Sequence, residues 1–269
     1  MDRTLFRVLA VLAVVSVIFL AAISINVFME ITYRATLSST YEYRVSITSD
    51  TTLENVTFYI PVPAKGPEAS AVLQGIGAGD LQGLPQGWNI SLIGTEKFTM
   101  LAVTAREIAS SPVGRPYLLS VNARVDGPID TRNAGTGGLV LVPAAKRTPA
   151  VCGNMDSQAS PEMRCELYQG STYADFTAPG NVHLTIFTFL TGRNTWDVFG
   201  PSSNEYQDGL QVSFSGGTRG WQTGDGILVT GIGDYGIDFW LQHPETSGTG
   251  SRGSGQNIGG ALSVGEGLA

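Results

Sequence analysis

Two cysteines are the residues whose type and spacing most clearly predict a chemical bond. Cys152 and Cys165 are the only cysteines in the chain, and a short, mostly polar stretch separates them. In an oxidising compartment outside the cytoplasm such a pair forms a disulfide, which restricts the unfolded chain and stabilises the fold by about 3 kcal/mol. A metal site is the alternative, but two thiols without a nearby histidine make a poor zinc ligand set. We therefore predict a disulfide between Cys152 and Cys165.

The other residues with chemical potential lack the spacing that a catalytic or cofactor site needs. Residues 231–236 fit the GxGxxG pattern, but a strand-like run follows them where a dinucleotide site needs a helix, so we interpret these glycines as a hairpin turn. His183 and His243 are far apart, and no serine lies in a GxSxG context. A minor alternative is a calcium site built from three turn aspartates, Asp225, Asp234 and Asp238. We predict no catalytic residue, no cofactor and no metal.

Two tryptophans and two glycosylation sequons are candidates for contact with carbohydrate at the protein surface. Trp196 and Trp221 lie near predicted turns, where tryptophan rings can stack on sugars, although core packing is the commoner role of this residue. Asn55-Val56-Thr57 and Asn89-Ile90-Ser91 are sequons on the polar side of alternating strands. We predict glycosylation at Asn55 and Asn89, with chance occurrence of the tripeptides as the alternative.

The composition excludes nucleic acid as a partner. The chain has 269 residues, with Lys+Arg 16 against Asp+Glu 23 and a net charge of −7. A chain with this balance repels a polyanion. Charged residues make up only 14%, well below the usual quarter or so, which means that the surface depends on Ser, Thr, Asn and Gly. Such a composition is common in all-β proteins of cell envelopes.

An apolar segment at residues 8–29 predicts a transmembrane anchor. As a helix it would measure roughly 33 Å, which matches the apolar core of a bilayer. A cleaved signal peptide has a shorter apolar region and then a small-residue site, whereas Ala21-Ala22-Ile23-Ser24 is followed by more apolar residues. Arg3 and Arg7 precede the segment, so the positive-inside rule places residues 1–7 in the cytoplasm. We therefore expect a single-pass cell-membrane protein with the bulk of the chain extracytoplasmic.

Strict alternation of apolar and polar residues predicts strands after the anchor. Residues 41–47 and 56–62 alternate on either side of a turn-like segment and are expected to pair as an antiparallel hairpin. Similar runs recur at residues 88–92, 98–103, 119–125, 182–190, 210–214, 227–232 and 237–241. No stretch outside the anchor shows a sustained helical period. We predict an all-β fold: one antiparallel β-sandwich over residues 32–243, on a single N-terminal transmembrane helix, with a flexible Gly/Ser-rich tail at 245–269.

Residues 143–180 lack clear periodicity and are predicted to form an insertion stapled by the disulfide. A connection this long inside a compact domain is usually functional or disordered, and a disulfide in its middle makes disorder the weaker alternative. Its apolar and aromatic side chains are expected either to meet a partner or to cover a sheet edge, and the sequence leaves both open. The candidate interaction residues are Met155, Met163, Tyr168, Tyr173 and Phe176.

The first half of the chain resembles a known group of proteins. The stretches concerned are Tyr41-Glu42-Tyr43-Arg44-Val45, Leu53-Glu54-Asn55-Val56-Thr57-Phe58-Tyr59-Ile60-Pro61-Val62-Pro63 and Gly87-Trp88-Asn89-Ile90-Ser91-Leu92. They resemble uncharacterised membrane-anchored envelope proteins of methanogenic archaea. The resemblance implies an archaeal cell surface but neither an activity nor catalytic residues.

Together these features predict a role at the cell envelope. We expect a structural or protein-interaction function, with membrane contact through residues 8–29 and other envelope proteins as partners. Carbohydrate binding is the alternative, with glycans as ligands, and it would require coplanar exposed tryptophans. An enzyme comes third, because it would require a cleft with convergent titratable groups. The prediction is therefore a binding or structural protein and not an enzyme.

Overall fold

Ten strands and three helices make up the described part of the chain. The computed structural model describes residues 3–65, 70–94, 99–111, 115–152, 162–217 and 219–236, with side chains from residue 9 onward. The elements are α1 (Arg3–Thr36), β1 (Ser38–Ser49), β2 (Leu53–Pro61), α2 (Ala71–Ala78), β3 (Trp88–Gly94), β4 (Thr99–Ile108), β5 (Tyr117–Val125), α3 (Ala134–Gly137), β6 (Thr148–Ala150), β7 (Arg164–Thr177), β8 (His183–Asp197), β9 (Pro201–Ser215) and β10 (Gly220–Gly233).

Helix α1 is long and apolar enough to cross a membrane. Within Leu9–Thr36, an 18-residue stretch reaches a mean hydropathy of 2.7. Its few polar side chains are satisfied by the helix itself: Ser16 and Ser24 each donate to the carbonyl oxygen four residues earlier at 2.8 Å, and the Asn26 amide does the same. Such bonds let polar side chains enter an apolar medium without water. The predicted anchor is therefore a helix, and this helix continues beyond the predicted end.

The helix leads directly into the β-domain and contacts it. The Tyr33 ring packs against Trp196 of β8, with ring centroids 5.6 Å apart. The Thr36 hydroxyl accepts a hydrogen bond of 3.0 Å from the Asp197 backbone N–H. Strand β1 then begins at Ser38, a few residues before the start of the predicted strand. The anchor is thus joined to the domain by packing as well as by the chain.

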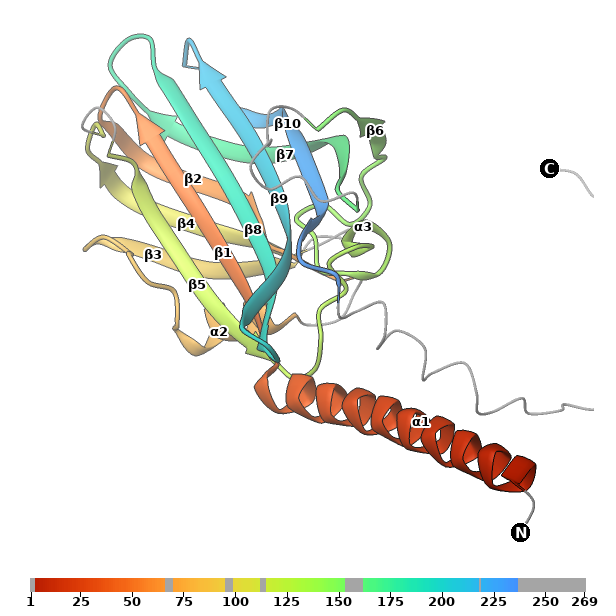
Figure 1. Ribbon diagram of the computed structural model, residues 1–269. Coiled ribbons are helices and arrows are strands. Elements are labelled where there is room, and N and C mark those ends of the chain that lie inside the picture. The colour runs from red at the N-terminus through yellow and green to blue at the C-terminus, as the bar shows by residue number, and fades with distance from the viewer. Residues whose placement is uncertain are drawn as a thin grey trace, which may run out of the picture. The chain divides into compact units, whose positions relative to one another are not determined.

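All ten strands belong to one antiparallel sheet that curls on itself. The strand order is β3-β4-β2-β7-β10-β9-β8-β1-β5, and β6 pairs with β7. Figure 1 shows β5, β1, β8 and β9 in front of β3, β4, β2 and β7. One apolar core lies between these two halves, with inward residues from both. The predicted all-β antiparallel sandwich is confirmed, and its two layers are halves of one continuous sheet.

The predicted hairpin between the first two strands is wrong. Strand β1 pairs with β5 and β8, whereas β2 pairs with β4 and β7. The two strands lie in opposite halves of the sheet, and the Tyr43 hydroxyl donates across the core to the Pro61 carbonyl at 2.8 Å. Alternation reveals that each strand buries one face, but it does not say which strands pair. Consecutive strands are neighbours in only about two-thirds of cases.

The C-terminal strands complete the sheet begun by the first half of the chain, as predicted. Strand β8 pairs with β1, and β10 pairs with β7. The glycines at residues 231–236 do not form the predicted hairpin turn, because Gly231 and Gly233 lie within β10 at a register shift against β9. Gly231 has φ of 76°, and a Cβ there would lie 2.2 Å from the Glu162 carbonyl oxygen. The predicted run at 237–241 and the tail at 245–269 lie outside the described residues.

A short helix that the sequence did not predict closes one end of the core. Helix α2 packs on β5 and β1. The Ser70 hydroxyl caps it by accepting from the Leu73 N–H at 3.1 Å and donates to the Pro63 carbonyl at 2.9 Å. A Cβ at Gly75 would lie 3.0 Å from the Val121 side chain, so this glycine permits the close approach to β5. Eight residues are too few for a periodicity signal.

Residues 139–142 run through the core without joining a named strand. All four residues are buried, so each backbone polar group needs a partner inside the protein. Val140 exchanges two backbone hydrogen bonds with Ala64, at 3.0 and 3.3 Å. The Leu141 N–H donates to the Asp208 carboxyl group at 2.8 Å. A connection of this kind can exist inside a core only because side chains replace the missing ladder.

Two further side chains donate hydrogen bonds to this buried segment. The Tyr206 hydroxyl of β9 donates to the Leu139 carbonyl. The Arg147 guanidinium donates to the Val142 carbonyl at 3.0 Å. Residues 139–142 are therefore held at both ends by polar side chains.

Asp208 on β9 is the buried acid of this arrangement. It is 0% exposed and also accepts a hydrogen bond of 2.5 Å from the Tyr168 hydroxyl of β7. Burial raises the pKa of Asp208 to about 6, against the lowering effect of its hydrogen bonds from Tyr168 and Leu141. Burial and the neighbouring Asp208 carboxyl group raise the pKa of Tyr168. Tyr168 therefore stays protonated and remains a hydrogen-bond donor.

We predict that Asp208 makes the protein less stable as pH rises through about 6. The folded pKa lies above the ordinary value of 3.8, so the folded state binds the extra proton between these values, and the contribution present at lower pH is lost as Asp208 ionises. The free energy of unfolding of the full chain in non-ionic detergent, minus that of Asp208→Asn, should fall by roughly 2 kcal/mol between pH 4 and pH 7. Urea titrations followed by near-ultraviolet circular dichroism measure it. A difference that does not change with pH would contradict the prediction.

Candidate functional site

The predicted insertion at residues 143–180 is not a single loop. Residues Arg164–Thr177 form β7, which lies in the sheet between β2 and β10. The inward positions of β7 include Glu166, Gly170 and Thr172, where an ordinary half-buried strand has apolar residues. Because these inward residues are polar or small, the sequence of this strand shows no apolar alternation. The predicted insertion at 143–180 is therefore wrong for residues 164–177, which form a strand of the sheet.

The predicted interaction residues are dispersed by this strand. Tyr168 and Phe176 point into the core and are 4% and 2% exposed, so they are not available to a partner. Tyr173 is half-buried on the outer face of the sheet. Met163 packs beside the disulfide. Met155 lies outside the described residues.

The disulfide prediction is confirmed. Cys152 and Cys165 are bonded, with Cα atoms 5.3 Å apart. Strand β6 brings them together, because Ala150 lies opposite Cys165 in the pairing with β7. Asn55 and Asn89 are both exposed, as attachment of a glycan requires, and glycosylation stays a prediction.

The residues considered for metal or catalytic chemistry do not converge. His183 begins β8, and its backbone N–H donates to the Asp50 carboxylate at 2.9 Å, which lowers the pKa of Asp50. Asp225 is exposed on the outer face of β10. His243 and Asp238 lie outside the described residues. Within the described ranges, no three His, Cys, Asp or Glu side chains form a group able to hold a metal ion.

A polar cavity of about 310 Å³ lies between the ends of β7 and β10 and the connection that contains α3. Three arginines from separate segments line it: Arg132 before α3, Arg147 before β6 and Arg164 at the start of β7. We call this cavity the arginine pocket. Its other polar lining residues are Glu166, Asn133, Thr136 and Thr230.

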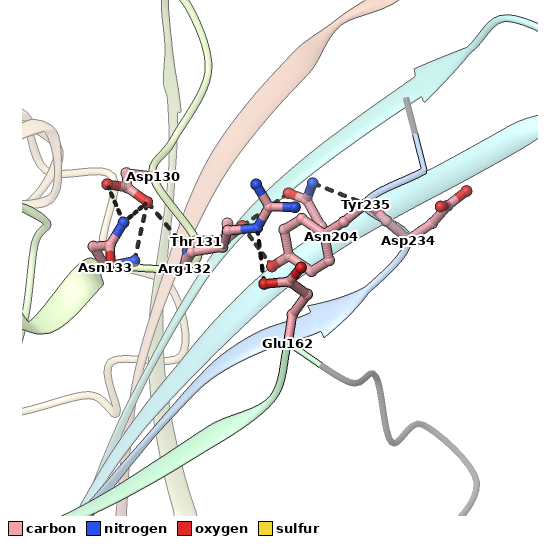
Figure 2. Close-up of polar contacts among 8 residues, drawn as sticks. All are labelled: Asp130, Thr131, Arg132, Asn133, Glu162, Asn204, Asp234 and Tyr235. Carbon is pink, nitrogen blue, oxygen red and sulfur yellow. Dashed lines mark hydrogen bonds and ion pairs between the residues drawn. The ribbon is translucent and has the colours of Figure 1, made fainter. Parts of the chain in front are cut away.

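Arg132 is held in place by its backbone and by its side chain. The Asp130 carboxylate accepts from the backbone N–H groups of Arg132 and Asn133, at 3.2 and 3.0 Å, and so shapes the turn. The Arg132 Nε lies 3.5 Å from the Glu162 carboxylate, and the guanidinium carbon lies 4.4 Å from the Tyr235 ring centroid. Figure 2 shows the Arg132 side chain beside the Tyr235 ring, with a dashed line to the Glu162 carboxylate.

A buried polar network supports this turn from behind. The Thr131 hydroxyl lies 2.8 Å from the Tyr235 hydroxyl and donates to the Asn204 side chain at 3.1 Å. Asn204, on β9, in turn accepts a bond of 2.9 Å from Asn194 on β8. These bonds, the first two of which are drawn in Figure 2, tie the pocket wall to two central strands.

Asn194 uses the full hydrogen-bonding capacity of its amide. Its carbonyl oxygen accepts from the Ser39 hydroxyl and from the Ile129 N–H, both at 2.8 Å. Its amide nitrogen donates to the Ile129 carbonyl at 2.8 Å and to Asn204. Asn194 is 2% exposed, so water cannot replace these partners.

Arg147 connects the arginine pocket to the core. Its guanidinium donates to the Val142 and Gly135 carbonyls at 3.0 and 3.4 Å. The guanidinium carbon also lies 5.5 Å from the ring centroid of Tyr168, the residue that donates to Asp208. The Nε of Arg147 is buried and has no hydrogen-bond partner among the described residues. The position of this arginine therefore depends on the same buried network that holds residues 139–142.

A second feature lies on the outer face of the sheet, where three aromatic residues stand side by side on adjacent strands. Tyr59 of β2 is opposite Tyr173 of β7, which is opposite Trp221 of β10. The two tyrosine rings are stacked with centroids 5.0 Å apart, and the Trp221 ring meets Tyr173 edge-on at 5.5 Å. Trp221 is 53% exposed. We call these three residues the aromatic row.

Hydroxyl and carboxylate groups flank the aromatic row on the same face. Thr57 and Asp175 are paired across β2 and β7, two positions along from the tyrosines. On the other side, the hydroxyls of Ser171 and Thr223 lie 3.3 Å apart. The row is therefore one ring wide with polar groups on both sides.

The other tryptophans do not add to this surface. Trp88 and Trp196 are 7% and 3% exposed, and Trp196 packs against Tyr33 of α1. Trp196 therefore does not serve the sugar-stacking role considered from the sequence. Trp240 lies outside the described residues.

The opposite half of the sheet carries an apolar hollow of about 280 Å³ on its outer face. Phe187 and Phe189 of β8 are stacked there, with ring centroids 5.9 Å apart. Leu118 of β5, which is 49% exposed, lies beside them, and Arg44 and Ser46 complete the lining. This hollow is the exposed apolar patch that a protein-interaction role requires.

Both the arginine pocket and the aromatic row were missed by reasoning from the sequence. Tyr59 falls within the predicted strand at residues 56–62, and Trp221 lies near a predicted turn, but nothing in the sequence placed them on neighbouring strands. The arginines carry no common spacing, because each comes from a different connection or strand end. Only the pairing of β7 with β10 and β2 brings these residues together.

We predict that Asn194→Ala destabilises the protein by about 3 kcal/mol. The change leaves the Ser39 hydroxyl and both Ile129 backbone groups buried without their partner. The matched control is Asn122→Ala, an exposed residue on β5, which should change the free energy of unfolding by less than about 0.5 kcal/mol. Denaturant titration of the full chain in detergent measures both. Equal effects of the two variants would show that the network adds no stability.

Comparison with known proteins adds no functional assignment to this geometry. No protein-family model, no curated protein and no solved structure matches the chain.

Proposed function

We propose that this chain is a membrane-anchored envelope protein whose outer β-domain binds carbohydrate through the aromatic row. The observation that carries the proposal is the half-exposed Trp221 beside Tyr59 and Tyr173 on three adjacent strands. Aromatic rings present apolar faces on which the C–H faces of sugar rings pack, and they lose little conformational entropy on binding. A rigid sheet positions such rings better than a loop does.

The polar neighbours of the row favour a sugar over a protein as the ligand. Thr57, Asp175, Ser171 and Thr223 offer donors and acceptors beside the rings, which suits a ligand with an apolar face and a rim of hydroxyls. The centre of a protein interface is instead depleted in charged residues. The sequence alone favoured a protein-interaction role. With the aromatic row and its polar neighbours, we favour carbohydrate binding instead.

The orientation in the membrane rests on charge and on the disulfide. Arg3 and Arg7 precede the apolar helix, which supports a cytoplasmic N-terminus. The Cys152–Cys165 disulfide is typical of domains outside the cytoplasm. The domain after α1 is then extracytoplasmic, where envelope polysaccharides are accessible to it.

A second candidate function is binding of an envelope protein at the apolar hollow on β5, β1 and β8. Phe187, Phe189 and Leu118 form an exposed apolar surface with Arg44 at its edge. Aromatic residues and arginine are the types enriched at protein interfaces. The hollow lies on the half of the sheet opposite the aromatic row, so the two surfaces can be tested separately.

We predict that a protease added to intact cells degrades the β-domain and leaves the anchor in the membrane. The expected product is a membrane-embedded fragment that contains α1, detected by an N-terminal tag after removal of the protease. Disruption of the cells before treatment provides the control for total accessibility. Protection of the β-domain in intact cells, with degradation after lysis, would place the domain in the cytoplasm.

We predict that Trp221→Ala weakens binding of envelope polysaccharide about tenfold, because the exposed ring of the aromatic row is lost. Trp221→Phe keeps an aromatic face and should weaken binding less. Binding is measured by co-sedimentation of the full chain in detergent with polysaccharide isolated from envelopes, and independently by tryptophan fluorescence. Trp221 is the described tryptophan that a surface ligand can reach.

Phe187→Ala is the matched control, because it removes an exposed aromatic ring from the other half of the sheet. It should leave polysaccharide binding unchanged. Equal loss of polysaccharide binding in Trp221→Ala and Phe187→Ala would contradict the carbohydrate proposal. Loss of cross-links to an envelope protein in Phe187→Ala alone would favour the second candidate.

A further inference from the structure

We propose that the arginine pocket binds a small oxyanion, that is, a carboxylate, sulfate or phosphate group. This proposal does not depend on carbohydrate binding by the aromatic row, which lies on the outer face of the sheet. The pocket opens instead between the inward residues of β7 and β10 and the connection around α3.

The charge of the pocket is opposite to that of the chain. Arg132, Arg147 and Arg164 bring three positive charges to one cavity, while Glu166 is the carboxylate that lines it. Even when Glu162, paired with Arg132 at 3.5 Å, is counted, the local balance is three positive charges against two negative ones. The whole chain has a net charge of −7. General basicity therefore does not explain the cluster, and like charges placed together repel unless an anion lies between them.

The arginines retain donor capacity for a ligand. A guanidinium carries five N–H donors in a planar fork that matches the oxygens of carboxylate and phosphate groups. Arg147 uses two of its groups on backbone carbonyls and has a further buried Nε donor without a partner in the described part of the chain. Arg164 is exposed at the start of β7 and forms no ion pair within the described ranges. Arg164 is thus the arginine whose guanidinium N–H groups are most available to donate hydrogen bonds to an anion.

The remaining lining residues suit a small polar ligand. Asn133, Thr136 and Thr230 add neutral hydrogen-bonding groups. The volume of about 310 Å³ is at the lower end of the range for small-molecule sites. Arginine stays protonated at every physiological pH, so the three arginines can hold a charge but cannot exchange protons with a substrate. The composition therefore fits anion binding better than acid–base catalysis.

The rigid walls support a preformed site. Arg132 is held by the turn at Asp130 and by the Tyr235 ring, and Arg147 by the carbonyls of Val142 and Gly135. Binding an anion then requires little ordering of the protein, which is the main cost for flexible arginine side chains. Arg164 would be the residue that moves onto the ligand.

The test measures binding of inorganic phosphate, sulfate and galacturonate to the full chain in non-ionic detergent by calorimetry, with neutral galactose as the uncharged comparison. We expect at least one of the three anions to bind and galactose not to bind at this site. Arg164→Gln should weaken anion binding about tenfold or more, whereas Arg164→Lys should weaken it less. Glu166→Gln removes the lining carboxylate and should strengthen binding several-fold.

Arg106→Gln is the control that matches the loss of charge, since Arg106 is exposed on β4, away from the pocket. It should change anion affinity by less than about twofold. A thermal melt of each variant without ligand checks that folding is intact. The best-bound anion distinguishes the sources: galacturonate indicates an acidic sugar, and phosphate or sulfate indicates an inorganic or esterified group.

Two results would overturn the proposal. One is that none of the three anions binds the wild-type chain at concentrations up to about 10 mM. The other is that Arg164→Gln and Arg106→Gln weaken binding equally, which would show a general charge effect. Failure of the polysaccharide experiment leaves this test unaffected, because the two experiments use variants on different faces of the sheet.

Discussion

The hydrogen bonding of residues 139–142 is the constraint on which the rest of the domain depends. These residues run through an apolar core without a strand ladder, and an unpaired backbone group there costs about 1–3 kcal/mol. Tyr206 and Asp208 of β9 and Arg147, which precedes β6, supply hydrogen-bond partners for this segment. The Asp208 carboxyl group is buried in order to reach the Leu141 N–H, and this burial raises its pKa to about 6. The curled sheet can close over its core because these side chains satisfy the segment that fills it.

The same network reaches the candidate site. Tyr168 donates to Asp208 on one side, and its ring lies under the Arg147 guanidinium on the other. An arginine that lines the pocket is thus positioned by a bond made in the core. The turn that carries Arg132 is supported in a similar way by Asn194 and Asn204, whose amides link it to β8 and β9. Buried polar groups therefore hold both arginine-bearing segments of the pocket, the one with Arg147 and the one with Arg132, in place.

Strand periodicity explains how one pair of strands serves two surfaces. On β7, Tyr173 faces outward into the aromatic row, while Arg164 and Glu166 line the pocket on the inner side. On β10, Trp221 faces outward and Thr230 lines the pocket. Successive side chains of a strand point to opposite faces, so the proposed carbohydrate surface and the proposed anion site occupy the same two strands without sharing a residue. At the other end of the chain, α1 reaches the same sheet through the contact between Tyr33 and Trp196.

By itself the sequence determined the apolar helix, the all-β class, the strands with strict alternation and the disulfide. Each of these depends on local composition, on a period of two, or on the presence of a single pair of cysteines. Only the tertiary structure decided that β1 and β2 lie in opposite halves, that β7 is a central strand, and that Tyr59, Tyr173 and Trp221 are neighbours. Strand β7 could not be recognised from its sequence because inward polar and small residues replace the apolar residues that make a period of two visible. The arginine pocket could not be recognised from the sequence because Arg132, Arg147 and Arg164 come from three separate segments. Only the tertiary fold brings these segments together, and it leaves no local pattern in the sequence.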